Sequence, residues 1–308
     1  MPLRSSFRSR LRMFTRLGTA LVLVALATMA ARAQSYDSII VFGDSYNDVG
    51  NIFTIAGQHG IVYPPAPYYN GRFSDGPIWI DDLAGSLGLT IKASALGGTD
   101  YAEGGAQLLQ TSTEQGLTIP SIEDQVAYYL ATNGGKADPK ALYVIEGGGD
   151  DILDATTFSP TTLGPAIAGG LYGIEVSLRK AGATSFLIPQ LINVGQLPAA
   201  AAGGPEFVAF ASATSIAANQ ALATDLQADS KLPGIHIYNI PTFQEFLTVA
   251  SIKGQFGFGD VVNPCLALAL NFVCGHPDEH LWWDSVHPSK FAHGYFAVLA
   301  GTALFYQQ

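Results

Sequence analysis

A serine, an aspartate and a histidine occur in two short segments whose composition suits nucleophilic catalysis. Ser45 lies in GDSYND (residues 43–48), directly after an apolar run, where Gly43 permits a tight turn. A serine hydroxyl is a weak nucleophile alone and needs a neighbouring base. The same residue types are ordinary in turns and helix caps. This segment by itself therefore leaves a structural role open.

A candidate base lies far downstream, in WWDSVHPS (residues 282–289). His287 precedes Pro288, which favours an extended conformation over a helix. Asp284 lies three residues before His287, so its carboxylate can accept a hydrogen bond from one ring nitrogen and fix the tautomer. An Asp–His pair that only caps the last helix would have the same spacing. That interpretation also stays open for this segment alone.

With three further segments, these two resemble the successive sequence blocks of GDSL (SGNH) hydrolases, a family of lipases and esterases. The segments follow the family's order across nearly the whole chain after its N-terminal stretch. An ordered set of this kind is far more specific than any single motif. The segments are GDSYNDVGN (43–51), GRFSDGPIWIDDLAGSLGL (71–89), YAEGGA (101–106), IEGGGDDIL (145–153) and WWDSVHPSKFAHGYFA (282–297).

The resemblance implies hydrolysis of carboxylic esters through an acyl-serine intermediate, without a cofactor. It implies Ser45 as nucleophile, His287 as base and Asp284 as the residue that orients the base. The family's oxyanion donors would be the backbone N–H of Ser45, a glycine of the YAEGGA block and a side chain of the next block. The alignment places the glycine at Gly105, with Gly104 as the alternative if it slips by one residue.

Two residues depart from the family's pattern. Tyr46 follows the serine where leucine is usual, which keeps a large, partly apolar side chain. Asp150 stands where the block G-x-N-D normally has an asparagine that donates to the oxyanion. An ionised carboxylate only accepts hydrogen bonds. At about 3 Å it would repel a developing negative charge by roughly 5 kcal/mol at an effective dielectric near 20.

Three hypotheses follow for Asp150. Burial and the neighbouring Asp151 keep it protonated, so that it donates as a neutral acid. Alternatively its side chain points away and two backbone donors remain. In the third case catalysis is impaired, and the chain is a sugar- or lipid-binding domain with a retired active site.

A metal-dependent hydrolase is a rival prediction. The segment HPDEH (residues 276–280) matches the H-x-x-E-H pattern of some zinc peptidases. That chemistry needs both histidines on one face of a continuous helix, and Pro277 opposes such a helix. The acidic residues near Ser45 and Asp150 lack the spacing of a calcium loop. We therefore expect no metal ligands.

Short strands that alternate with helices must position these residues. Strands that are apolar on both faces, with helices between them, predict a parallel sheet covered on both sides. Functional residues of such sheets collect at the carboxyl ends of the strands. Together with the resemblance, this predicts an α/β fold, a flavodoxin-like three-layer α/β/α sandwich. The predicted strands are Ser38–Phe42, Ala141–Ile145, Ser185–Ile188 and Ile235–Asn239, with a weaker one at Thr90–Ser94. The predicted helices are Pro77–Leu87, Ser121–Thr132, Thr161–Ala181, Pro205–Ser230 and Pro288–Leu304, and the stretch Pro198–Pro205 is predicted as a loop.

The first 33 residues are predicted to be a secretory signal peptide. Five arginines precede an apolar run at Leu17–Ala30, and Ala31-Arg32-Ala33 supplies a small-x-small cleavage site. An apolar run of this length is short of the roughly 20 residues that span a bilayer. We expect a secreted or periplasmic protein without stable membrane insertion, in which residues 34–308 form a single domain.

The composition of the exported part limits its partners. Residues 1–33 hold six of the 15 Lys and Arg and none of the 25 Asp and Glu, which leaves a net charge of −16. Such acidity argues against nucleic acid and anionic membranes. A small-molecule, lipid or carbohydrate ester is the expected substrate, and the oligomeric state is not determined. Cys265 and Cys274 are close in sequence, so we expect a disulfide, with free thiols as the alternative.

Two aromatic features have two interpretations each, and a third feature has one. The loop Tyr63–Tyr69 either lines the mouth of the site or is a rigid surface loop. Trp282 and Trp283 either wall the pocket or pack in the core. His293 is expected to be structural.

Overall fold

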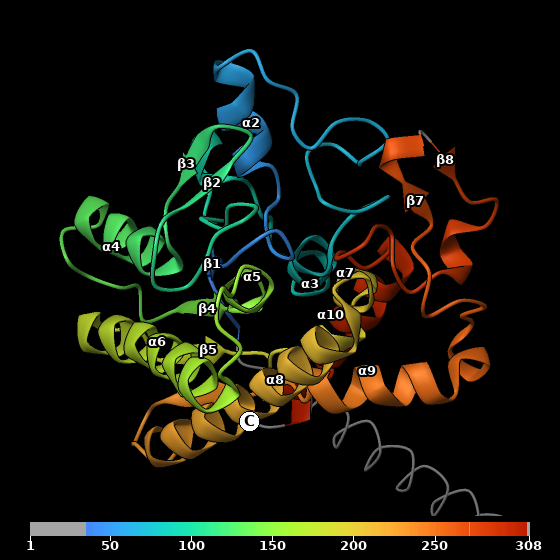
Figure 1. Cartoon of the computed structure of the whole chain (residues 1–308). Coiled ribbons are helices and arrows are strands. Elements are labelled where there is room, and N and C mark those ends of the chain that lie inside the picture. Colours follow the sequence, from blue (N-terminus) through green and yellow to red (C-terminus); the bar gives the residue numbers. More distant parts are fainter. Residues whose placement is uncertain (1–34, 271, 307–308) are drawn as a thin grey trace, which may run out of the picture. The chain divides into compact units, whose positions relative to one another are not determined.

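Four parallel strands form the central sheet of the computed structural model, in the order β1-β4-β5-β6 (Figure 1). They are β1 (Ser38–Phe42), β4 (Ala141–Ile145), β5 (Ser185–Leu187) and β6 (His236–Tyr238). Every residue of β4 and β5 is buried, as both faces of the sheet are covered. The four stronger strand predictions are confirmed, with β5 and β6 slightly shorter than expected.

Helices cover both faces of this sheet. On one side α6 (Pro160–Ala181) packs against α8 (Gly204–Asp229), and α4 (Ile122–Thr132) contacts α6. The helix α3 (Trp79–Ser86) packs instead against the last helix, α10 (Lys290–Tyr306). Right-handed crossovers place these two groups on opposite faces. The predicted three-layer α/β/α architecture is therefore confirmed (Figure 1).

The fifth strand predicted at Thr90–Ser94 is wrong. The chain there enters a 3-10 turn at Ser94–Leu96 and folds back on itself, and a Cβ on Gly98 would lie 2.0 Å from the carbonyl oxygen of Lys92. Only the segment around Asp100 reaches the sheet, where Val41 N–H donates to Thr99 and Tyr101 N–H donates to Val41. The tight turn leaves no room for a regular edge strand.

Helix starts follow local capping chemistry. Ser121 precedes α4, and its hydroxyl accepts from the N–H of Asp124 at 3.0 Å. The last helix begins at Lys290, two residues after the predicted start, because Ser289 occupies the capping position and its hydroxyl accepts from Ala292 N–H.

Several shorter elements were not predicted. The stretch expected to be a loop at Pro198–Pro205 contains α7 (Pro198–Ala202), since proline is compatible with a first helical turn and alanine favours a helix. The others are α2 (Asn51–Gln58), α5 (Gly149–Leu153), α9 (Thr242–Ser251), the hairpin of β2 (Ser112–Glu114) and β3 (Leu117–Ile119), and the hairpin of β7 (Leu266–Ala267) and β8 (Phe272–Val273).

The structure describes residues 35–270 and 272–306. The predicted signal peptide, residues 1–33, lies outside them. From Tyr36 onwards the described residues form one compact unit. None of their helices has the length and apolarity needed to cross a bilayer.

Candidate active site

The turn after β1 presents Ser45 at the carboxyl end of the sheet. Asp44 stabilises the turn, because its carboxylate accepts from Tyr46 N–H and its carbonyl accepts from the N–H groups of Asn47 and Asp48. Gly43 is required by close packing, since a Cβ there would lie 2.4 Å from the Asn47 side chain and 2.9 Å from the backbone oxygen of residue 146.

Ser45, His287 and Asp284 form a continuous hydrogen-bonded line. The Oγ of Ser45 lies 2.8 Å from Nε2 of His287, and Nδ1 of His287 lies 2.7 Å from Oδ2 of Asp284. All three residues are less than a tenth exposed. The two predicted segments, 242 residues apart between serine and histidine, are therefore brought into direct contact.

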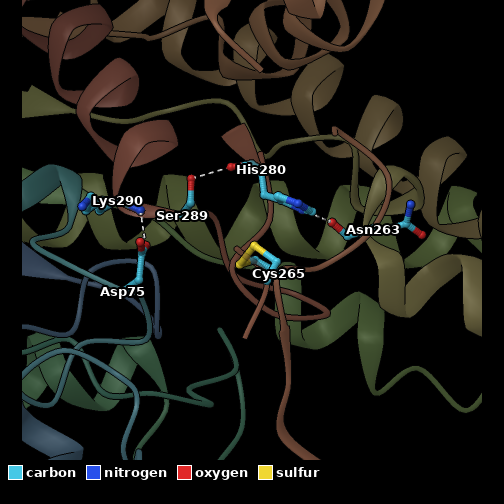
Figure 2. Close-up of a disulfide and its surroundings, with 7 residues drawn as sticks. Asp75, Asn263, Cys265, His280, Ser289 and Lys290 are labelled. Atoms are coloured by element: carbon cyan, nitrogen blue, oxygen red, sulfur yellow. Dashed lines mark hydrogen bonds between the residues drawn. A yellow bond between two sulfur atoms is a disulfide. The ribbon is translucent and has the colours of Figure 1, made fainter. Parts of the chain in front are cut away.

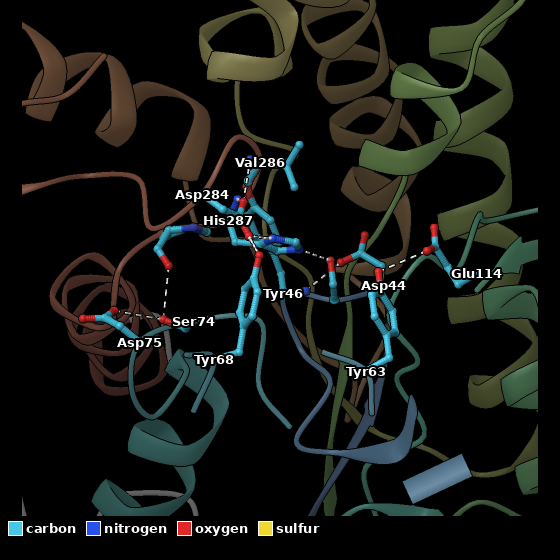
Figure 3. A network of polar contacts seen from close by, with 12 residues as sticks. Asp44, Tyr46, Tyr63, Tyr68, Ser74, Asp75, Glu114, Asp284, Val286 and His287 are labelled. Atoms are coloured by element: carbon cyan, nitrogen blue, oxygen red, sulfur yellow. Dashed lines mark hydrogen bonds and ion pairs between the residues drawn. The ribbon is translucent and has the colours of Figure 1, made fainter. Parts of the chain in front are cut away.

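Asp284 is surrounded by donors. Its carboxylate accepts from the ring of His287, from the backbone N–H groups of Val286 and His287, and from the hydroxyl of Tyr68 (Figure 3). Burial acts to raise the pKa of Asp284, but the charge of His287 and these hydrogen bonds outweigh it and leave the pKa lowered. Asp284 is thus held as a carboxylate.

Aromatic rings enclose His287. The ring of Phe73 stacks on the imidazole with centroids 4.9 Å apart, and the ring of Tyr46 lies 5.9 Å away on a different plane. The hydroxyl of Tyr46 donates to the carbonyl of Val286 at 2.5 Å, which fixes the residue before His287. The tyrosine at the family's leucine position therefore supports the histidine loop.

The predicted oxyanion donors include two backbone N–H groups, those of Ser45 and Gly105. Within residues 35–270 and 272–306, the N–H groups of Ser45 and Gly105 donate to no protein acceptor. Gly105 has φ +82°, and a Cβ there would meet the Glu114 side chain at 2.4 Å. The N–H of Gly104 instead donates to Asp48 at 2.9 Å. Because the N–H of Gly104 is already bonded to Asp48, Gly105 stays the predicted donor.

Asp150 lies in the first turn of α5 and lines the same cleft as Ser45 and His287. Its neighbour Asp151 faces elsewhere and accepts from the N–H of Leu108. Burial, and after it the negative charge of Asp44 and other carboxylates, raise the pKa of Asp150 well above its usual value. A protonated Asp150 can donate a hydrogen bond, which an ionised one cannot.

Two more acidic groups line the cleft. Burial raises the pKa of Asp44 to about 6. Burial and the charge of Asp44 raise the pKa of Glu146 well above its usual value. The side-chain amide of Asn47 donates to Glu146 at 2.6 Å, and its oxygen accepts from Trp79. No sequence pattern distinguishes Glu146 as a site residue, because only the fold brings it to Asp44.

The cleft beside Ser45 is lined by acidic and by aliphatic side chains. Its acidic end is formed by the groups just described, and its other wall is aliphatic. That wall consists of Leu153, Leu191, Ile192, Val194, Leu197 and Val286.

The remaining candidate residues have structural positions. Trp282 is fully buried and its indole donates to the carbonyl of Val261. Trp283 packs against the cysteines, and neither indole lines the cleft, so both belong to the core. His293 is buried in α10, where burial lowers its pKa to about 3. In the HPDEH segment Pro277–Glu279 form a 3-10 turn, so no continuous α-helix carries its two histidines.

Cys265 and Cys274 form a disulfide (Figure 2). It closes the β7–β8 hairpin next to the histidine loop. The N–H groups of Cys265 and Leu266 donate to the carbonyls of Trp282 and Trp283. The hairpin is thus bonded to the two residues that directly precede Asp284.

Comparisons with known proteins find sequence similarity to lipases and esterases. The sequence model of the family described as GDSL-like Lipase/Acylhydrolase matches residues 39–299. Lipase 1 of Photorhabdus luminescens is 30% identical over 182 residues, which are 57% of this chain but a quarter (25%) of that protein. The phosphatidylcholine-sterol acyltransferase of Aeromonas hydrophila is 27% identical over 79% of this chain and 70% of its own length. A GDSL esterase/lipase of Arabidopsis thaliana is 26% identical over 82% of this chain and 84% of its own length.

Solved structures with a related arrangement are distant in sequence. A member of the lipolytic protein G-D-S-L family from Veillonella parvula has a TM-score of 0.46 at 15% identity, covering 86% of this chain and 96% of its own. The acetylxylan esterase Axe2 of Geobacillus stearothermophilus has a TM-score of 0.48 at 12% identity, covering 90% and 97%.

Proposed function

The chain belongs to the family of GDSL-like lipases and acylhydrolases and is a carboxylic ester hydrolase, and we propose that it acts as a serine esterase through an acyl-serine intermediate. The hydrogen-bonded line from Ser45 through His287 to Asp284 carries this proposal. Each group has the role that acyl transfer requires: a nucleophile, a base within 2.8 Å of it, and a carboxylate that orients the base.

The proton transfers follow from the hydrogen bonds. Because Nδ1 of His287 donates to the Asp284 carboxylate, Nε2 is left as the acceptor for the Ser45 proton. Ser45 Oγ attacks the ester carbonyl carbon while Nε2 takes its proton. The tetrahedral intermediate then expels the alcohol, which receives that proton. Water attacks the acyl-serine by the same route and regenerates Ser45. These steps need no cofactor or metal.

Three donors would stabilise the oxyanion. The unpaired N–H groups of Ser45 and Gly105 supply two of them. The third is Asp150 in its protonated form, which is supported by its raised pKa and its place in the cleft. Activity then requires His287 neutral and Asp150 protonated, so the pH profile should be narrow.

The aliphatic part of the cleft lining supports an ester substrate with an apolar group. Its aliphatic wall suits the apolar part of a lipid or acylated carbohydrate, and the acidic composition disfavours nucleic acid. We further propose export to the periplasm or the medium, supported by the N-terminal sequence pattern and by the disulfide.

The decisive experiment is hydrolysis of a short-chain p-nitrophenyl ester from pH 4 to 9 by the wild type and by Ser45→Ala. We expect activity in the wild type and a loss of at least about a thousandfold in the variant, since the nucleophile is gone. Reaction with an organophosphate should add one adduct at Ser45, measured by mass spectrometry.

Equal rates in the two proteins would contradict the serine mechanism. No hydrolysis and no organophosphate adduct in either would instead favour a binding domain with a retired site. Asp150 is the residue that motivates that second candidate, because an ionised carboxylate there would oppose the oxyanion.

A further inference from the structure

Tyr68 makes a contact with the Asp–His pair that the proposed mechanism does not yet use. Its hydroxyl donates to Oδ2 of Asp284 at 2.6 Å, the same oxygen that accepts from His287 Nδ1 (Figure 3). The other oxygen, Oδ1, accepts from the N–H groups of Val286 and His287. Among the described residues, Tyr68 is the one donor to Asp284 from outside segment 284–287. It lies 216 residues earlier in the chain.

The ring of Tyr68 is held on two sides. It meets the ring of Trp283 edge to face at 6.2 Å and that of Phe73 at 6.1 Å. Trp283 in turn packs against Cys265 of the disulfide, and Phe73 stacks on His287. The Tyr68 N–H donates to the carbonyl of Pro65, which fixes the loop locally. The hydroxyl is therefore presented to Asp284 by a packed aromatic group.

This contact has an electrostatic consequence. Asp284 is 7% exposed, so each of its lone pairs needs a protein donor. Burial and the charge of Asp284 raise the pKa of Tyr68 well above its usual value, so the phenol keeps its proton and donates. A donor on Oδ2 stops the carboxylate from rotating and draws negative charge away from its bond with His287.

We propose that Tyr68 is a positioning residue for the proposed serine mechanism. Its hydroxyl holds Oδ2 of Asp284 where Nδ1 of His287 requires it, and it weakens the attraction between the carboxylate and protonated His287. The second effect matters because His287 must give its proton to the departing alcohol. This inference rests on the proposed function above, in which His287 is the base.

The test is Tyr68→Phe, which keeps the ring and removes the hydroxyl. We expect kcat to fall about tenfold, the size of one lost hydrogen bond to a charged group. KM stays unchanged, because Tyr68 does not line the cleft. The acid limb of kcat/KM moves to higher pH, because a carboxylate with one donor fewer holds the imidazolium more strongly. The matched control is Tyr69→Phe, whose hydroxyl bonds to no group among residues 35–270 and 272–306 and should leave both limbs in place.

A profile of Tyr68→Phe that coincides with that of Tyr69→Phe would overturn the proposal. So would a lower kcat with both pH limbs unmoved and a lower melting temperature, since that pattern marks a purely structural role. The low-field proton NMR signal of the imidazole Nδ1–H supplies a readout without turnover. This signal should shift in Tyr68→Phe and keep its position in Tyr69→Phe. Both results are expected whether or not Ser45→Ala retains activity, because the signal does not depend on turnover. An unmoved signal in Tyr68→Phe would overturn the positioning role by itself.

Discussion

Asp150 lies where several carboxyl groups share one partly buried cleft. Asp44 and Glu146 line the same space, Asp151 is the next residue of α5, and Asp154 directly follows that helix. Each carboxylate that ionises makes the next ionisation harder, because like charges in a poorly solvated site repel. Burial and these neighbouring charges together raise the pKa of Asp150 and so favour the protonated form that we propose as an oxyanion donor.

Replacing Asp150 by asparagine tests this directly. The amide donates at every pH, so Asp150→Asn should raise kcat/KM and extend the alkaline side of its profile. The measurement is the rate of p-nitrophenyl ester hydrolysis from pH 5 to 10.

Asp154→Asn is the matched variant, and it should shift the alkaline limb of the pH profile in the opposite direction. Its negative charge helps to raise the pKa of Asp150, so its removal should move the alkaline limb of the wild-type profile to lower pH. If the Asp150→Asn profile kept the wild-type rate and shape, Asp150 would not be an oxyanion donor.

At the scale of elements, the β7–β8 hairpin supports the loop that carries Asp284. The strand β7 bonds to the carbonyls of Trp282 and Trp283, and the disulfide between Cys265 and Cys274 closes the hairpin (Figure 2). Two such short strands would be marginal without the cross-link. The loop that carries Asp284 therefore depends on a disulfide between two cysteines that are nine residues apart in the sequence.

Removing that bond should affect stability and catalysis together. Cys265→Ala with Cys274→Ala should lower the free energy of unfolding by about 2–3 kcal/mol, the loop-closure contribution for this separation. It should also lower kcat, because Asp284 loses part of its support. Urea unfolding and steady-state kinetics measure the two effects. Wild type treated with a reductant should behave like the double variant, and unchanged stability in both would argue against this role for the hairpin.

At the scale of the whole molecule, buried acids determine how stability varies with pH. Burial raises the pKa of Asp44 and Asp48 to about 6, of Glu175 to about 7 and of Glu103 to about 8. In an unfolded chain these groups titrate near 4. Between about pH 4 and 8 the folded protein therefore binds more protons than the unfolded one, and stability falls as the pH rises. Asp284 has the opposite sign, but its stabilisation is lost only below this range.

We expect the melting temperature to decrease steadily from about pH 5 to pH 8. Glu103→Gln should flatten the slope, because the Glu103 carboxyl group has the highest pKa of these four and does not line the Ser45 cleft. The exposed Glu123→Gln serves as the control and should keep the wild-type slope. Differential scanning calorimetry across this range would check the trend, and a melting temperature that rises with pH would contradict it.

Local chemistry explains what could be predicted from the sequence. The apolar runs of β1 and β4 are recognisable because both faces of a parallel strand are buried. The start of α4 is encoded by Ser121 and Asp124, which are three residues apart and cap each other's backbone. Ser45, Asp284 and His287 lie in short ordered segments, so their juxtaposition could be expected from the resemblance alone. These signals are local, and a single sequence contains them in full.

Contacts between distant residues were decided by the tertiary structure. No pattern in the sequence links Tyr68 to Asp284 or Asn47 to Glu146, because those pairs meet only when separate loops converge at the edge of the sheet. The resemblance places Asp150 at the family's asparagine position, but residue type alone does not distinguish it from Asp151. Yet successive residues of a helix point about 100° apart, so one lines the cleft and the other bonds Leu108. The sequence determines which groups are available for the chemistry, whereas their partners and protonation depend on which loops the folded sheet brings together.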